Sequence, residues 1–104
     1  MTTQVKIGKR KYKIKERKIN PKHYAEFDQY TQEILLQPGI RSYTKAKSLY
    51  HEILHGIVAE YIPEFLTFDE EEKVVRAIEK GWIEFSEHNP AQALMLQARL
   101  SLRK

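Results

Sequence analysis

Two histidines one helical turn apart, with a glutamate between them, are the residues of this chain best suited to chemistry. The segment His51-Glu52-Ile53-Leu54-His55 has the HExxH pattern. Residues four apart lie on one face of a helix, with Cβ atoms about 5–6 Å apart. Both imidazoles can therefore hold one zinc ion, through Zn–N bonds of roughly 2.0–2.1 Å. Glu52 can then act as the general base toward a zinc-bound water. The pattern predicts metal ligands at His51 and His55 and a catalytic carboxylate at Glu52.

The residues around this motif predict a long helix, which is needed to place both rings on one side. Apolar residues recur there at helical spacing, at Leu49, Ile53, Leu54, Ile57 and Val58. We expect the helix to begin near Ser42 or Thr44 and to end at about Tyr61. Pro63 should stop it, because a proline ring excludes a continuing helix.

A zinc site with two histidines needs a third protein ligand, and the chain has no cysteine to supply it. The candidates are the downstream residues Glu70, Glu71, Glu72 and His88. Glu72 lies 17 residues after His55, which leaves room for a loop and a returning helix. Helical geometry of 3.6 residues per turn argues for Glu71 instead, because Glu71 falls near the centre of the next apolar stripe. A carboxylate buried there would need a partner. We favour Glu72 and keep Glu71 as the alternative.

The elements on either side of the motif helix predict a small α+β domain covering residues 1–104. Alternating apolar and polar residues indicate two strands within residues 4–19, turning at Gly8-Lys9-Arg10. A second pair of strands is expected at 24–28 and 33–37. A second helix should begin around 67–69, where Thr67 and Asp69 each precede a glutamate by three residues. Its apolar stripe is Val75, Ile78, Trp82 and Phe85, and Asn89-Pro90 should cap and open a third helix. We expect an antiparallel sheet of three or four strands followed by three helices.

Positive charge is concentrated at the start of the chain. Residues 1–22 carry nine Lys and Arg against Glu16 alone, whereas the rest of the chain has a net charge of −4. Lys11, Lys13 and Lys15 alternate with apolar residues, which is typical of a half-buried hairpin with a solvated outer face. Basic residues 6–22 also make nucleic acid or an acidic protein a possible partner. There is no apolar signal core and no membrane-length apolar run, so we expect a soluble, cytoplasmic protein.

The chain resembles small phage- and prophage-encoded HExxH proteins of Gram-positive bacteria, which are minimal zinc-peptidase-like domains of the gluzincin type. The resemblance rests on the hairpin around Ile7-Gly8-Lys9, the strand at 33–36, the stretch 49–57, the run 71–75, and the residues at 81–82 and 88–90. It implies zinc as the cofactor, His51, His55 and Glu72 as metal ligands, and Glu52 as the catalytic base. It also implies a zincin-like fold, with a sheet packed above the motif helix and an edge strand that could hold a peptide.

The leading expectation is a zinc metallopeptidase-like enzyme that hydrolyses peptide bonds in a cytoplasmic protein, in the host cytoplasm if the chain is phage-encoded. Stabilisation of the oxyanion would fall to one of Tyr24, Tyr43, Tyr61, Arg76 or His88. The alternative is a non-catalytic regulatory or binding protein of a phage or mobile element. In that case zinc is structural, and the basic hairpin binds a host protein or nucleic acid.

Overall fold

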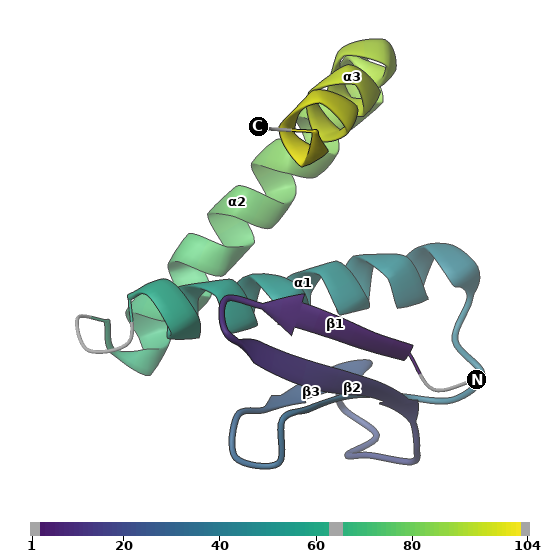
Figure 1. Ribbon diagram of the computed structural model, residues 1–104. Coiled ribbons are helices and arrows are strands. Elements are labelled where there is room, and N and C mark those ends of the chain that lie inside the picture. Colours follow the sequence, from purple (N-terminus) through teal and green to yellow (C-terminus); the bar gives the residue numbers. More distant parts are fainter. Residues whose placement is uncertain (1–2, 63–65, 103–104) are drawn as a thin grey trace.

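Four strands precede three helices in the computed structural model, which describes residues 3–62 and 66–102. The strands are β1 (Thr3–Ile7), β2 (Arg10–Glu16), β3 (Ala25–Asp28) and β4 (Glu33–Leu36), and the helices are α1 (Ser42–Tyr61), α2 (Phe68–His88) and α3 (Pro90–Ser101). Figure 1 shows α1 lying against the sheet, while α2 crosses α1 and extends away with α3 at its far end. The predicted α+β domain, with strands first and helices after, is confirmed. Pro63, which we expected to stop the motif helix, lies outside the described residues.

The sheet is mixed, whereas we expected every pair of strands to be antiparallel. Its strand order is β1-β2-β4-β3, with antiparallel pairs at both ends and a parallel pair in the middle, where Ile14 is the partner of Ile34. The physical reason is the apolar character of β4, whose residues Ile34, Leu35 and Leu36 are all buried. Such a strand is stable between two neighbours. The chain therefore passes from β2 to the edge strand β3 and returns along β4, which makes β4 parallel to β2.

Gln37 holds the loop that makes this crossing. Its Oε1 accepts a hydrogen bond from the backbone N–H of Ile19 at 3.1 Å. Its Nε2 donates to the carbonyl oxygens of Ile19, Asn20 and His23, at 3.2 to 3.3 Å. One side chain thus satisfies several backbone groups of a loop without regular structure, and the loop leads directly into β3.

The main core lies between the sheet and α1. The inward side chains of the strands, Ile7, Tyr12, Ile34 and Leu36, are buried and pack against Leu49 and Ile53 of α1. A Cβ atom at Gly56 would lie 2.8 Å from Cδ1 of Ile7 and 3.1 Å from Cε1 of Phe27. Gly56 therefore permits the close approach of α1 to the sheet, because no larger residue fits the remaining space.

A second, smaller core joins α1 to the first half of α2. Leu54 and Val58 are buried there against Val75. Helix α2 begins with a capping box. The side-chain oxygen of Thr67 accepts a hydrogen bond from the backbone N–H of Glu70, and the carboxylate of Glu70 accepts one from the backbone N–H of Thr67. The predicted apolar stripe of α2 is buried only at Val75. Ile78 and Phe85 are exposed instead. Glu79, the neighbour of Ile78, still contacts His51 of α1, so Ile78 is exposed because it lies on another side of α2.

A single residue, Asn89, connects α2 to α3. Pro90 takes the first position of α3, as expected. Asn89 occupies the position before it, but its side chain does not cap α3: the Nδ2 atom donates to the carbonyl oxygen of Phe85 in α2. Within residues 3–62 and 66–102, no helix has both the length and the apolar content that a membrane span requires.

Candidate metal centre

Helices α1 and α2 bring two imidazoles and one carboxylate to a single point. His51 and His55 lie one turn apart on α1, with ring centroids 4.9 Å apart. Oε1 of Glu72, on the second turn of α2, lies 2.9 Å from Nε2 of His51 and 3.2 Å from Nε2 of His55. One ligand atom from each of the three residues lies within 4.8 Å of the others, so the group could hold a metal ion.

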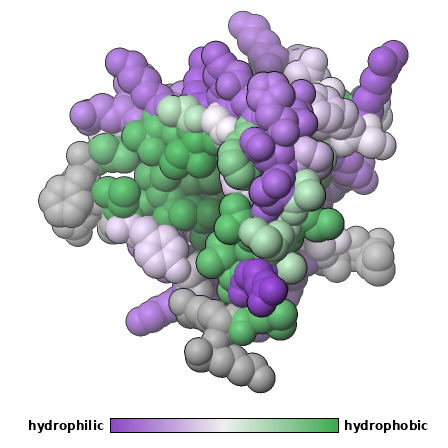
Figure 2. Space-filling view, turned by 90° about the horizontal axis from the view of Figure 1, so that it is seen from above, coloured by the Kyte–Doolittle hydropathy of each residue, from purple (hydrophilic) through white to green (hydrophobic). Residues whose placement is uncertain are grey.

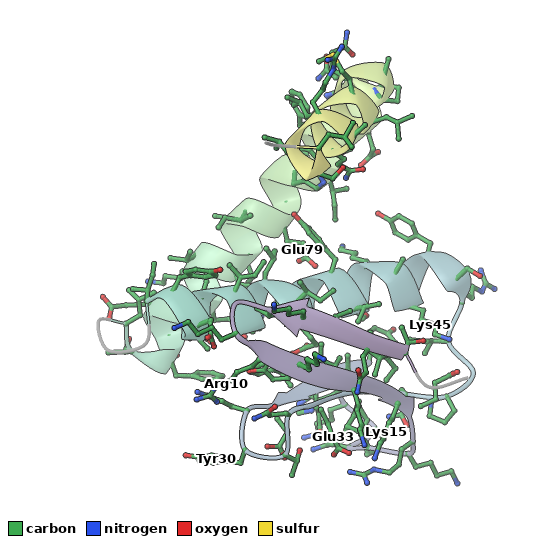
Figure 3. The ribbon with its side chains drawn as sticks, viewed as in Figure 1. Arg10, Lys15, Tyr30, Glu33, Lys45 and Glu79 are labelled. Atoms are coloured by element: carbon green, nitrogen blue, oxygen red, sulfur yellow. The ribbon has the colours of Figure 1, made fainter. Side chains whose placement is uncertain are left out.

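The other nitrogen of each ring is held by a separate carboxylate of α2. Nδ1 of His55 lies 2.7 Å from Oε2 of Glu71, and Nδ1 of His51 lies 3.3 Å from Oε1 of Glu79. Figure 3 shows Glu79 between α2 and α1. A carboxylate that accepts a hydrogen bond from Nδ1 favours the tautomer with a free lone pair on Nε2. Both rings are thereby oriented with Nε2 available for a cation beside Glu72.

Two of the three spacings between the donor atoms are close to those of a tetrahedral zinc site. Zn–N and Zn–O bonds of roughly 2.0–2.1 Å place neighbouring ligand atoms about 3.3 Å apart in a tetrahedron. The distances of 2.9 and 3.2 Å from Glu72 to the two rings are close to this value. The cluster is also sheltered, since His55 is only 8% exposed. Three protein donors leave one tetrahedral position for water or substrate.

The structure separates the roles of the neighbouring glutamates that the sequence left open. Glu72 faces both Nε2 atoms, whereas Glu71 contacts Nδ1 of His55. Glu70 belongs to the capping box, and His88 lies at the far end of α2. Sequence reasoning missed Glu79. A signal was available, because Glu79 follows Glu72 by seven residues, which is two helical turns and therefore the same face of α2.

Charge and burial act differently on the two central carboxyl groups. Burial raises the pKa of Glu52, and positive charge on His51 and His55 only partly opposes this effect. Burial also acts to raise the pKa of Glu72, but the positive charges of His55 and His51 outweigh it, and the pKa is lowered. Arg76 adds to this from 3.7 Å. Of the two carboxyl groups, Glu72 therefore has the lower pKa and Glu52 is the stronger base.

The cluster opens into a cleft of about 830 Å³ between α1, α2 and the edge strand β3. Glu52 lines the cleft together with both histidines, and residues 25–27 of β3 also line it. Of the residues considered for oxyanion stabilisation, three line the cleft, namely Tyr24, Tyr43 and Arg76, and two are not among its lining residues, namely Tyr61 and His88. An extended chain could therefore lie along β3 and pass over the cluster.

No family model, no curated protein and no solved structure matches this chain. The chemistry of the site is accordingly inferred from its donor atoms, their surroundings and the cleft. The resemblance to gluzincin-type proteins stays a prediction.

Proposed function

We propose that this chain is a zinc-dependent peptidase that hydrolyses peptide bonds in an extended segment of a protein. The observation that carries the proposal is the paired orientation of the histidines: Glu79 and Glu71 hold the Nδ1 atoms, and both Nε2 atoms lie beside Oε1 of Glu72. Two imidazoles and one carboxylate are a donor set that zinc prefers. The cleft beside them supplies space for a substrate.

The residues of the chain have separate roles in this proposal. His51, His55 and Glu72 hold the ion, which would act as a Lewis acid on the scissile carbonyl and lower the pKa of a water ligand. Glu52 accepts the proton of the attacking water at its carboxylate and returns it to the leaving amine. Arg76 lines the same cleft and can donate hydrogen bonds to the developing oxyanion.

The edge strand β3 is the proposed binding site for the substrate backbone. It is the last strand in the order β1-β2-β4-β3, so one of its edges is unpaired within the sheet. Residues 25–27 of this strand line the cleft. An extended peptide can add to such an edge through backbone hydrogen bonds, which depend little on the amino-acid sequence of the peptide. We expect a protein substrate that presents an unfolded or extended segment.

Metal analysis of a small set of variants tests the site. Wild-type protein dialysed against zinc should contain one ion per chain by mass spectrometry. His51→Ala, His55→Ala and Glu72→Gln should lose stoichiometric zinc, whereas Glu52→Gln should keep it. Full metal content in Glu72→Gln, or none in the wild type, would refute the assignment.

Hydrolysis of a fluorogenic peptide library tests the reaction itself. Zinc-loaded wild type should cleave a subset of the peptides, and Glu52→Gln should lose this activity while it retains its metal. Removal of zinc with a chelator should abolish cleavage, and added zinc should restore it. A zinc-loaded protein that cleaves nothing, or a Glu52→Gln variant as active as the wild type, would contradict a role in peptide hydrolysis.

A second candidate function, binding of single-stranded nucleic acid, is favoured by the outer face of the sheet. Lys6 of β1 lies directly opposite Lys11 of β2, and both are exposed. Like charges in this position destabilise a sheet. No described carboxylate forms an ion pair with either residue or with the nearby Lys13. A bound polyanion would relieve the repulsion, and Tyr30, 98% exposed at the β3–β4 turn, offers a surface for base stacking.

Fluorescence anisotropy with a labelled oligothymidine tests this second function. Binding should weaken as salt increases, with a slope of about −0.7 per phosphate contacted. The double variant Lys6→Glu/Lys11→Glu should lose binding. Lys73→Glu/Lys80→Glu makes the same charge change at exposed positions on α2 and should retain it. No binding at low salt, or equal loss in both variants, would exclude a nucleic-acid site on this face.

A further inference from the structure

Helices α2 and α3 form an arm, residues 68–101, that rests on α1 and on no strand. Among the described strands and helices, α2 contacts only α1 and α3, and α3 contacts only α2. Val75, which packs against Leu54 and Val58 of α1, and Ala93 are the only buried residues of the arm. Figure 1 shows the arm leaving α1 at an angle, and Figure 2, which looks onto the molecule from the side of α3, shows hydrophobic side chains uncovered there. Apolar burial, which stabilises in proportion to the area removed from water, therefore holds little of the arm.

The polar contacts between the arm and α1 all pass through the two histidines of the candidate metal centre. His51 lies 2.9 Å from Glu72 and 3.3 Å from Glu79, and His55 lies 2.7 Å from Glu71 and 3.2 Å from Glu72. Among the described residues, no other side-chain hydrogen bond or ion pair joins α1 to α2. The position of the arm on α1 therefore depends on the same side chains that could hold a metal ion.

These contacts also gather negative charge. Glu71, Glu72 and Glu79 of α2 line one cleft with Glu52 of α1 and both imidazole rings. Carboxylates that share a site repel one another. Apart from the rings, the only described residue that forms an ion pair with any of them is Arg76, whose side chain is 73% exposed and is screened by water. A divalent cation between the rings and Glu72 would offset two of these negative charges.

We propose that a metal ion held by His51, His55 and Glu72 keeps the arm docked on α1, and that the arm leaves α1 when the ion is removed. Two of these ligands belong to α1 and one belongs to α2, so binding of the ion favours the docked state over any state in which the two helices are apart. The inference rests on the metal site of the proposed function but not on peptide hydrolysis. Its consequence is that the cleft, which is lined by α1, α2 and β3, exists only in the metal-loaded protein.

Energy transfer from Trp82 of α2 to a label on α1 tests the docking. Trp82 is the only tryptophan and the chain has no cysteine, so a dansyl group on one introduced cysteine is the only acceptor. Lys47 of α1 and Ile83, the neighbour of Trp82, line one cavity of about 410 Å³, so a label on Lys47→Cys lies across this cavity from α2. Zinc-loaded protein should show strong transfer, and a chelator should remove most of it. Gln92→Cys on α3 is the matched control, because label and tryptophan then both belong to the arm and transfer should not depend on zinc.

Hydrogen exchange measures the same change without a label. Removal of zinc should make the amides of α2 and α3 exchange about tenfold faster or more, because a helix without tertiary contacts frays. The amides of β1, β2, β3 and β4 should exchange as before. Glu72→Gln should behave like the metal-free protein even when zinc is present. Glu52→Gln, which should keep its zinc, should behave like the zinc-loaded wild type.

The zinc content of each sample, measured by mass spectrometry, separates the possible failures. Bound zinc with unchanged transfer and unchanged exchange would refute the docking role and leave the proposed peptidase site intact. Absence of bound zinc in the wild type would refute the metal site, and the docking role with it. Faster exchange of the strands to the same degree would also overturn the proposal, because the ion would then stabilise the whole domain rather than the arm.

Discussion

Nδ1 of His55 lies 2.7 Å from Oε2 of Glu71, on the side of the ring opposite to Glu72. This contact sets the orientation of the ring, because the hydrogen bond to Nδ1 determines which nitrogen is free to bind a cation. In the proposed zinc site, Glu71 would therefore position the ligand His55 without being a ligand itself.

Replacing Glu71 with glutamine should lower zinc affinity about 10- to 100-fold, which is the usual effect of losing a carboxylate that orients a histidine ligand. The affinity is measured by competition with a chromophoric chelator. Glu70→Gln is the matched control, because Glu70 caps the helix and a glutamine still accepts the capping hydrogen bond. Complete loss of the site in Glu71→Gln, with little change in Glu72→Gln, would assign the ligand to Glu71.

Alanine at Gly56 should destabilise the fold relative to alanine at Gly81. Both glycines lie inside helices, where alanine gains about 1 kcal/mol in helix propensity. Only at Gly56 would the added methyl group meet Ile7 and Phe27, since nothing lies within 4 Å at Gly81. Overpacking should make Gly56→Ala less stable than Gly81→Ala by about 1–3 kcal/mol. Urea unfolding measures this difference. Equal stabilities of the two variants would mean that the sheet shifts to make room for the methyl group at position 56.

The ion pair between Lys15 of β2 and Glu33 of β4 should make part of the stability depend on pH. Nζ of Lys15 lies 2.6 Å from Oε2 of Glu33. Figure 3 labels the two side chains next to each other on the sheet. The hydrogen bond from Lys15 holds the pKa of Glu33 below its ordinary value of 4.5. The carboxyl group of Glu33 binds a proton more readily in the unfolded chain than in the folded chain. The stabilisation is therefore present above pH 4.5 and is lost as pH falls through the lower pKa of Glu33 in the folded chain.

Urea midpoints measured between about pH 2 and pH 7 test this dependence. Glu33→Gln should reduce the loss of stability on acidification. Glu84→Gln removes the same charge from an exposed position on α2 and should leave the acid profile close to that of the wild type. A Glu33→Gln profile parallel to the wild-type profile would show that the ion pair does not contribute.

Loss of the capping box should affect both stability and metal binding. Thr67→Ala removes the side-chain acceptor at the start of α2 and should lower stability by about 1 kcal/mol. Because Glu71 ends the first turn of α2 and Glu72 follows it directly, fraying of this turn should also weaken zinc binding. Thr67→Ser keeps the hydroxyl and should restore both properties. Reduced stability with unchanged zinc affinity would mean that the metal ion itself orders this turn.

Local spacing made much of the fold predictable from the sequence. Hydrophobic alternation placed β1 and β2, and helical periodicity, with the capping signal at Thr67 and the proline at position 90, placed the helices. These features depend on residues that are near one another in the chain. The placement of His51 and His55 on one face of α1 follows for the same reason, because a separation of four residues fixes their geometry inside any helix.

Tertiary packing alone decided the remainder. The rotation of α2 against α1 selected Glu72 over Glu71 at the Nε2 atoms and brought Glu79 to His51. The parallel pairing of β2 with β4 and the exposure of Ile78 depended equally on distant contacts. Periodicity gives the direction of a side chain relative to its own helix. Only the packing of Leu54 and Val58 of α1 against Val75 of α2 fixes which side of α2 faces the histidines.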